Sequence, residues 1–204
     1  MKICVTLDDV IRAKSRQFFK IYKKHGFDPH FEIPEDDEFT TNSLADICNF
    51  ETTDDYQRFL YIDYPFEIFG EAEVMEKMLD KNFNLWCLAL SDDDELEEEI
   101  EIMLGNPMEF NASIGYTHFF LSKIATRVRE TYFPTDSLKL WDKCDVMITA
   151  DPNLIRNKPE GKKCVKINMP YNKGLSCDVE YDSLNDFIND KEWYKKLKDE
   201  QQSI

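Results

Sequence analysis

The chain has 204 residues, of which 42% are hydrophobic and 15 are phenylalanine, so it is long enough to bury a core of its own. Its net charge of -16 and its sequence pI near 4.6 would repel a phosphate backbone, so no binding to the backbone of DNA or RNA is expected. No run approaches the roughly twenty apolar residues that cross a bilayer, and the N-terminus has no signal-peptide core, so no membrane association is expected.

Six cysteines are scattered along the chain without a C-x-x-C spacing. Cys4, Cys87 and Cys164 lie within apolar runs, where a free thiol packs like a small hydrophobic group. A reduced, cytoplasmic compartment is therefore expected, and a zinc site is not.

The first part of the chain predicts one strand, one helix and an insertion. Residues 2–7 form a short apolar and β-branched run, which is typical of a buried strand. Residues 12–25 have the apolar spacing of a helix. Residues 27–65 contain several prolines and an acidic patch and show no regular pattern, so we expect an irregular insertion there.

The remaining predicted elements alternate between helices and strands. Helices are expected at 71–80, 92–104, 117–130 and 183–197, and strands at 84–90, 131–133, 145–149 and 163–167. This alternation predicts an α/β fold with a parallel sheet covered by helices on both faces, a three-layer arrangement. We expect residues 1–204 to form one domain, with 27–65 as a small insertion after the first strand and helix.

Polar side chains surround the end of the first predicted strand. Thr6 lies near its carboxyl end, and Asp8 and Asp9 follow directly. Open α/β sheets bind their ligands at the carboxyl ends of their strands. A carboxylate at this place is suited to general acid and base catalysis, so Asp8 and Thr6 are candidate catalytic residues.

Two further candidates for ligand contact also have simpler interpretations. Ser91 follows predicted strand 84–90, but a serine followed three residues later by Asp94 is also a helix-capping signal. Lys123 lies among apolar residues and could balance a ligand's negative charge. The alternative is a surface lysine on an amphipathic helix.

The end of predicted strand 145–149 provides another carboxylate. Asp151 follows this strand and precedes Pro152, so it is a candidate metal ligand. The pair Asp151-Pro152 is also an ordinary turn signal. No Gly-rich phosphate loop is present, and the three histidines have no evident nucleophilic partner.

Residues 2–11 resemble the first motif of haloacid dehalogenase (HAD) superfamily phosphatases, an apolar strand followed by Asp-x-Asp-Gly/Asp-Val/Thr-Leu. In this comparison Asp8 matches the second Asp, and Thr6 stands where the family has its nucleophilic Asp. In that family the nucleophilic carboxylate attacks phosphorus and helps to hold Mg²⁺. The resemblance therefore implies an acid–base and metal-binding role for Asp8 and a missing nucleophile at Thr6.

Residues 145–155 resemble the fourth motif of the same superfamily, in the form found in its 5'(3')-deoxyribonucleotidase-like branch, and residues 161–172 continue the similarity. Together the resemblance covers residues 1–15 and 84–182. It implies phosphate contacts from Ser91 and Lys123, metal binding by Asp8 and Asp151, and a cap at 27–65. Ala150 occupies the place of the metal-binding Asp, and Asp151 is displaced by one residue.

The missing carboxylates at Thr6 and Ala150 predict weak or absent Mg²⁺ binding. The leading hypothesis is a catalytically impaired, phosphatase-like protein that binds a phosphorylated small molecule or a protein partner. A second hypothesis is an active magnesium-dependent phosphomonoesterase or 5'-nucleotidase, in which Asp8 or Asp9 replaces the nucleophile and residues 92–94 and 151 hold the metal. A third is a phage-encoded structural or host-interaction protein, located in the host cytoplasm or the virion.

Overall fold

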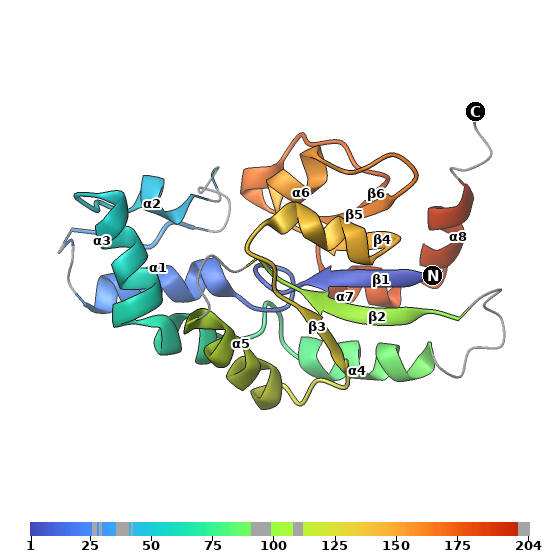
Figure 1. Ribbon diagram of the computed structural model, residues 1–204, viewed down its shortest axis with the longest axis horizontal. Helices are drawn as coiled ribbons and strands as arrows, with labels where there is room; N and C mark the ends of the chain where they lie inside the picture. Colours follow the sequence, from blue (N-terminus) through green and yellow to red (C-terminus); the bar gives the residue numbers. More distant parts are fainter. Residues whose placement is uncertain are drawn as a thin grey trace.

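The computed structural model describes residues 1–25, 28, 30–35, 41, 43–90, 99–107 and 112–199. Its centre is a six-stranded sheet in the order β3-β2-β1-β4-β5-β6, in which every neighbouring pair is parallel (Figure 1). The strands are β1 (Lys2–Thr6), β2 (Glu101–Gly105), β3 (Glu130–Tyr132), β4 (Val146–Thr149), β5 (Lys163–Ile167) and β6 (Val179–Tyr181). The parallel α/β sheet expected from the sequence is therefore confirmed.

Successive side chains of β1 enter two different cores, because side chains alternate across a strand. Ile3 and Val5 belong to the larger core, and Cys4 belongs to the smaller one. The larger core includes residues of α4 (Leu79–Ala89), α7 (Leu184–Asn189) and α8 (Trp193–Asp199). The smaller core includes residues of the 3₁₀-helix η3 (Ser137–Lys143) and of α6 (Pro152–Arg156). Helices thus cover both faces of the sheet and give the expected three layers.

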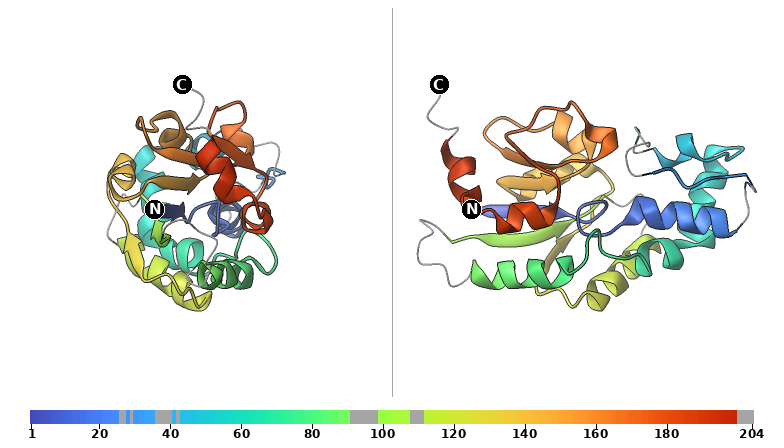
Figure 2. Two further views of the ribbon diagram at one scale, coloured as in Figure 1. Left: turned by 90° about the vertical axis from the view of Figure 1, so that its right-hand side faces the viewer. Right: turned by 180° about the vertical axis from the view of Figure 1, so that it is seen from behind.

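A second group of helices lies beyond the carboxyl end of β1, at the opposite end of the molecule from the N-terminus and α8 (Figures 1 and 2). It consists of α1 (Lys14–Lys24), α2 (Leu44–Ile47), α3 (Thr53–Arg58), the π-helices η1 (Phe59–Asp63) and η2 (Phe66–Gly70), and α5 (Ala112–Lys123). Phe18 packs within ring-contact distance of Tyr22, Phe50 and Phe59. Part of the segment expected to be irregular is therefore helical, because its aromatic residues pack on α1.

The prediction of a strand at 84–90 is wrong, since these residues lie in helix α4 and the turn that follows it. Leu79, Phe83, Trp86 and Leu90 are buried, whereas Leu85 is 63% exposed. The spacing of the buried positions, 4, 3 and 4 residues, is that of one helix face. The second core strand is instead β2, so the helix expected to extend to residue 104 is also wrong from residue 101 onward.

The later elements agree more closely with the sequence. Strands β3, β4 and β5 lie where strands were expected. Helix α5 begins and ends earlier than predicted, and the C-terminal helix is divided into α7 and α8, with β6 preceding them. Within the described part of the chain, no helix combines the length and apolar character that a membrane crossing requires.

Candidate functional site

The sheet changes its winding direction at β1, which lies between β2 and β4. Such a switch point places the ends of neighbouring strands around a crevice. A cavity of about 440 Å³ is found there. It is lined by residues that follow the strands and by residues of the helical group, namely Thr6, Asp8, Asp9, Lys14, Ser15, Ser43, Leu44, Tyr56, Tyr61, Asn106, Pro107, Thr135, Ser137, Asp151 and Tyr171.

At the end of β1, Thr6 lines the cavity and contacts the hydroxyl of Thr149 at the end of β4. The Thr6 hydroxyl lies 3.1 Å from the Thr149 hydroxyl and 3.4 Å from the carbonyl oxygen of Ile148. Both threonines are buried. The Thr149 hydroxyl also accepts a hydrogen bond from the backbone N–H of Asp151, 3.0 Å away. The Thr6 hydroxyl therefore contacts a carbonyl and another hydroxyl, neither of which is a base that could activate it as a nucleophile at neutral pH.

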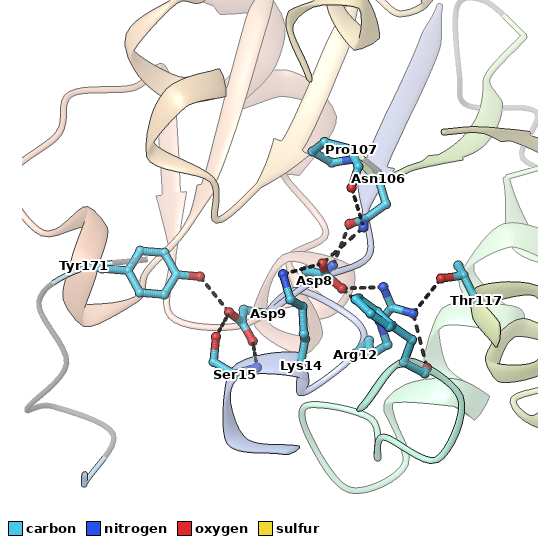
Figure 3. Close-up of polar contacts among 10 residues, drawn as sticks. Asp8, Asp9, Arg12, Lys14, Ser15, Asn106, Pro107, Thr117 and Tyr171 are labelled. Atoms are coloured by element: carbon cyan, nitrogen blue, oxygen red, sulfur yellow. Dashed lines mark hydrogen bonds and ion pairs between the residues drawn. The ribbon is translucent and has the colours of Figure 1, made fainter. Parts of the chain in front are cut away.

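Asp8 occupies the centre of the loop that follows β1 (Figure 3). The backbone N–H of Arg12 donates to the Leu7 carbonyl, so the loop turns back and brings the Arg12 side chain to Asp8. Asp8 Oδ1 accepts from Arg12 Nε at 2.8 Å and from Arg12 Nη2 at 2.5 Å. Asp8 Oδ2 lies 3.2 Å from Lys14 Nζ and 3.1 Å from Asn106 Nδ2. Both oxygens of this carboxylate are thus engaged by groups of the chain itself.

These partners determine the charge of Asp8. Burial raises the pKa of Asp8, but the charges of Arg12 and Lys14 and the hydrogen bonds from Arg12 and Asn106 outweigh burial and lower it to about 2. Asn106 is the first residue after β2, and its amide both donates to Asp8 Oδ2 and accepts from the Asp8 backbone N–H at 3.1 Å. Asp8 is therefore a permanently charged group at neutral pH.

Arg12 is fully buried behind Asp8. Its Nη1 donates to the Thr117 hydroxyl at 2.9 Å and to the Phe69 carbonyl at 3.2 Å. The guanidinium carbon also lies 5.2 Å from the ring centroid of Phe69 and 5.5 Å from that of Phe120. A buried charge is tolerated when it is paired and hydrogen-bonded, and Arg12 meets both conditions.

Lys14 is the first residue of α1, and its ammonium group lies on the cavity side of Asp8. Burial lowers the pKa of Lys14, but the negative charge of Asp8 and the nearby Tyr56 and Tyr61 raise it above the usual range for lysine. The Lys14 side chain remains 22% exposed. The cavity therefore contains a fixed positive charge that is accessible to a small ligand.

Asp9 faces a different set of partners. Its φ of 57° lies in the left-handed region, which Asp adopts more readily than most residues. Its Oδ1 accepts from the Ser15 N–H at 3.0 Å, and its Oδ2 accepts from the hydroxyls of Ser15 at 2.5 Å and Tyr171 at 3.1 Å. Burial raises the pKa of Asp9, although the Ser15 hydrogen bonds oppose this. Asp9 thus joins the start of α1 to Tyr171.

Asp151 lines the cavity, whereas Ala150 is fully buried and does not line it. Asp151 Oδ1 caps helix α6, accepting from the N–H groups of Asn153 at 2.7 Å and Leu154 at 3.4 Å. Burial raises the pKa of Asp151. The capping contacts of Asp151 therefore agree with the interpretation of Asp151-Pro152 as a turn signal. Asp151 also lines the same cavity as Asp8.

Of the two expected phosphate contacts, Lys123 does not line the cavity and Ser91 is not among the described residues. Lys123 Nζ donates to the carbonyl oxygens of Glu71 at 3.0 Å and Ala72 at 2.6 Å, and Lys123 is not among the cavity-lining residues. Ser91 lies outside the described residues, as do residues 92–94. Because residues 84–89 are helical, Ser91 does not follow a core strand. That position is taken by Asn106 after β2.

The described residues do not fit a magnesium site. No group of three or more His, Cys, Asp or Glu side chains among them is close enough to hold a metal ion. A cation that took Asp8 as a ligand would have to displace Arg12 and Lys14 or lie beside them. At an effective dielectric constant of about 20, two like unit charges 4 Å apart repel by about 4 kcal/mol, and the repulsion doubles for a divalent ion. We therefore derive no step through a metal at this site.

Sequence reasoning missed Arg12, Lys14, Asn106 and Tyr171 as site residues. Tyr171 lies in 3₁₀-helix η4 (Pro170–Asn172), within the segment that resembles the fourth-motif region. A signal for Arg12 was present, because it lies four residues after Asp8 and such pairs often meet. Asn106 was hidden because its strand was assigned to a helix.

No family model and no curated protein sequence matches this chain. Among solved structures, the fold is similar to that of a protein from Burkholderia xenovorans LB400 that is provisionally assigned as a haloacid dehalogenase-like hydrolase. The TM-score is 0.52 and the sequence identity is 11%, and the similarity covers 95% of this chain and 97% of that chain. At this identity the likeness concerns the fold. This chain therefore shares its α/β fold with that protein, and the α/β fold class expected from the sequence is confirmed.

Proposed function

We propose that this protein binds a phosphorylated small molecule in the cavity at the ends of β1, β2 and β4, and that it does not hydrolyse phosphoesters at enzymatic rates. Both statements rest on the difference in charge between the strand ends and the residues that follow β1. The Thr6 hydroxyl at the end of β1 contacts the neutral hydroxyl of Thr149, and Asp8, which follows β1, is already paired with Arg12 and Lys14.

The volume and the lining of the cavity are suited to a small ligand. Its volume of about 440 Å³ lies within the range of small-molecule sites. Its lining includes the Lys14 ammonium group and the hydroxyls of Ser43, Thr135 and Ser137, all of which can donate to phosphate or sugar oxygens. Burial raises the pKa of the Asp9 and Asp151 carboxyls, which also line the cavity.

The helical segment within 27–65 would act as the cap of this site. Ser43, Leu44, Tyr56 and Tyr61 line the cavity opposite the strand ends. Aromatic rings at this position favour a ligand with a ring in its organic part. A nucleoside monophosphate fits this description and also agrees with the resemblance to the 5'(3')-deoxyribonucleotidase-like branch, so nucleoside monophosphates are the first ligands to test.

The experiment has a binding arm and a turnover arm. Nucleoside and sugar monophosphates are titrated into the protein by calorimetry, and release of inorganic phosphate from the same compounds is followed with and without Mg²⁺. We expect saturable binding of at least one compound and no turnover above that of a Thr6→Ala variant. Magnesium-dependent turnover that is lost on Asp8→Asn would instead support an active phosphomonoesterase. Absence of binding to every compound would contradict the proposal.

A further inference from the structure

We propose that Lys14 is the group that holds the phosphate of the ligand, in the place of a divalent cation, so that phosphate binding by this protein is independent of metal. This inference rests on the proposed function, since it assumes that the ligand is phosphorylated. It adds the identity of the anchoring residue and the absence of a metal requirement. In this binding site, the positive charge that holds the phosphate comes from a side chain of the protein.

The position of Lys14 follows from the way in which Asp8 is held. Arg12 engages Asp8 Oδ1 through two nitrogens, and this leaves Oδ2 facing Lys14 and Asn106 (Figure 3). Asp8 is thus a positioning residue, because it fixes the Lys14 ammonium group at the cavity wall. An ammonium group has three donors, and the ion pair with Asp8 Oδ2 uses one direction only. The remaining directions are available to oxygens of a ligand in the cavity.

Arg12 is unsuited to the same role. It is fully buried, it does not line the cavity, and its donors are directed to Asp8, Thr117 and Phe69. Among the described residues that line the cavity, Lys14 is the only one with a basic side chain. Arg12 therefore pairs with Asp8 from the buried side, and Lys14 places its charge at the cavity, near the carboxyl groups of Asp8 and Asp9.

The ligand class follows from what surrounds Lys14. Tyr56 and Tyr61 act electrostatically on its ammonium group from the helical side, and Asp8 does so from the strand side. An anion bound to Lys14 thus has the phenol rings on one side and the hydroxyls of Thr135 and Ser137 lining the same cavity. These groups suit a phosphomonoester, whose terminal oxygens accept from Lys14 while its organic part lies against the tyrosines.

The test uses inorganic phosphate as the probe, because it contains only the part of the ligand that Lys14 is proposed to bind. Phosphate is titrated by calorimetry into the full-length protein in EDTA and again in excess Mg²⁺. The same titrations are made with Lys14→Met, and with Lys20→Met as a matched control. Lys20 lies on the same helix, and its side chain is 53% exposed. Circular dichroism of each variant checks that it is folded.

We expect equal affinity in EDTA and in Mg²⁺, a loss of roughly 10- to 100-fold for Lys14→Met, and no change for Lys20→Met. Binding that disappears in EDTA and returns with Mg²⁺ would overturn the inference, as would full affinity in folded Lys14→Met. Both of these results would leave the proposed phosphate-binding function intact. If Lys14→Met does not fold, the inference is tested by the phosphate affinity of the unmodified protein in EDTA and in Mg²⁺. Affinity that requires Mg²⁺ would still overturn it. If phosphate and the monophosphates all fail to bind under either condition, the proposed function and this inference are both wrong.

Discussion

Two neighbouring parts of the candidate site differ in charge. At the ends of β1 and β4, Thr6 and Thr149 form a neutral pair of hydroxyls. Beyond the end of β1, Asp8 and Arg12 in the loop and Lys14 at the start of α1 form a buried or half-buried group of three charges. The strand ends are therefore neutral, whereas the charged group contains two cations and one anion.

Both features favour an anion and disfavour a cation. A hydroxyl adds no charge to attract a metal, and the two cations of the loop repel one. The energetic weights of the two parts differ, however. A neutral hydrogen bond contributes about 1 kcal/mol, whereas removal of one partner from a buried ion pair costs several kcal/mol. Substitutions in the loop should therefore have much larger effects than substitutions at the strand ends.

The largest effect is expected for Arg12→Met. This change removes the buried guanidinium and leaves Asp8 Oδ1, the Thr117 hydroxyl and the Phe69 carbonyl without the donor that Arg12 provides. We expect the free energy of unfolding to fall by about 3–5 kcal/mol, measured by urea denaturation. A loss that large is a substantial part of the stability of an ordinary domain.

The control is Arg58→Met, since Arg58 forms an ion pair with Asp63 while its side chain is 69% exposed. An exposed pair of this kind contributes about 0–1 kcal/mol, so this variant should be close to the unmodified protein. If Arg12→Met were as mild as Arg58→Met, Asp8 would not depend on Arg12, and the contrast between the loop and the strand ends would fail.

Lowering the pH is expected to have an intermediate effect on the free energy of unfolding. The folded pKa of Asp8 is lowered from 3.8 to about 2, so the stabilisation that Asp8 gives is fully present above pH 4 and is lost as pH falls toward 2. A shift of this size corresponds to about 2 kcal/mol. The free energy of unfolding is measured between pH 5 and pH 2 for the unmodified protein and for Asp8→Asn.

We expect Asp8→Asn to be less stable at pH 5 and to show an acid-induced decrease that is smaller by about 2 kcal/mol. Asp190, whose pKa is also lowered to about 2 through its contacts with Lys196 and Tyr181, is present in both proteins and cancels in the comparison. Parallel curves for the two proteins would mean that Asp8 is not held by the loop cations in the folded state.

A smaller effect is expected at the strand ends. Thr6→Val removes the hydroxyl and keeps the branched shape, so packing in the sheet is preserved. The Thr149 hydroxyl retains its hydrogen bond from the Asp151 N–H. We expect a loss of about 1 kcal/mol by urea denaturation and no change in phosphate affinity. A loss as large as that of Arg12→Met would show that the hydroxyl pair is part of the charged network.

The sequence was most informative where one local signal decided the structure. Strands β1, β4 and β5 were predicted because short apolar runs in the middle of a parallel sheet are buried on both faces. The segment 84–90 was misassigned because its run of Leu, Trp and Cys has the same composition as such a strand. Its helical character is visible only in the wider spacing of Leu79, Phe83, Trp86 and Leu90, which extends beyond the run itself.

The candidate site was predictable in its location but not in its charge balance. Asp8 and Asp151 follow strands, so their presence at one cavity could be inferred from the topology of a parallel sheet. The pairing of Asp8 with Lys14 and Asn106 depends on a tight loop with Asp9 at positive φ and on the register of β1 with β2. Neither the loop conformation nor the strand register is encoded in a local pattern.

Lys123 provides the smallest effect and the sharpest contrast with Lys14, because the sequence made Lys123 a candidate phosphate contact. In the structure its ammonium group contacts two carbonyl oxygens at the end of η2 and lies outside the cavity. Lys123→Met should lower the free energy of unfolding by about 0.5 kcal/mol, since Lys123 is exposed, and should leave phosphate affinity unchanged. Calorimetry of Lys123→Met beside Lys14→Met measures this directly. If Lys123→Met weakened phosphate binding and Lys14→Met did not, the positive charge that serves the ligand would lie on α5, and the assignment made from the loop geometry would be wrong.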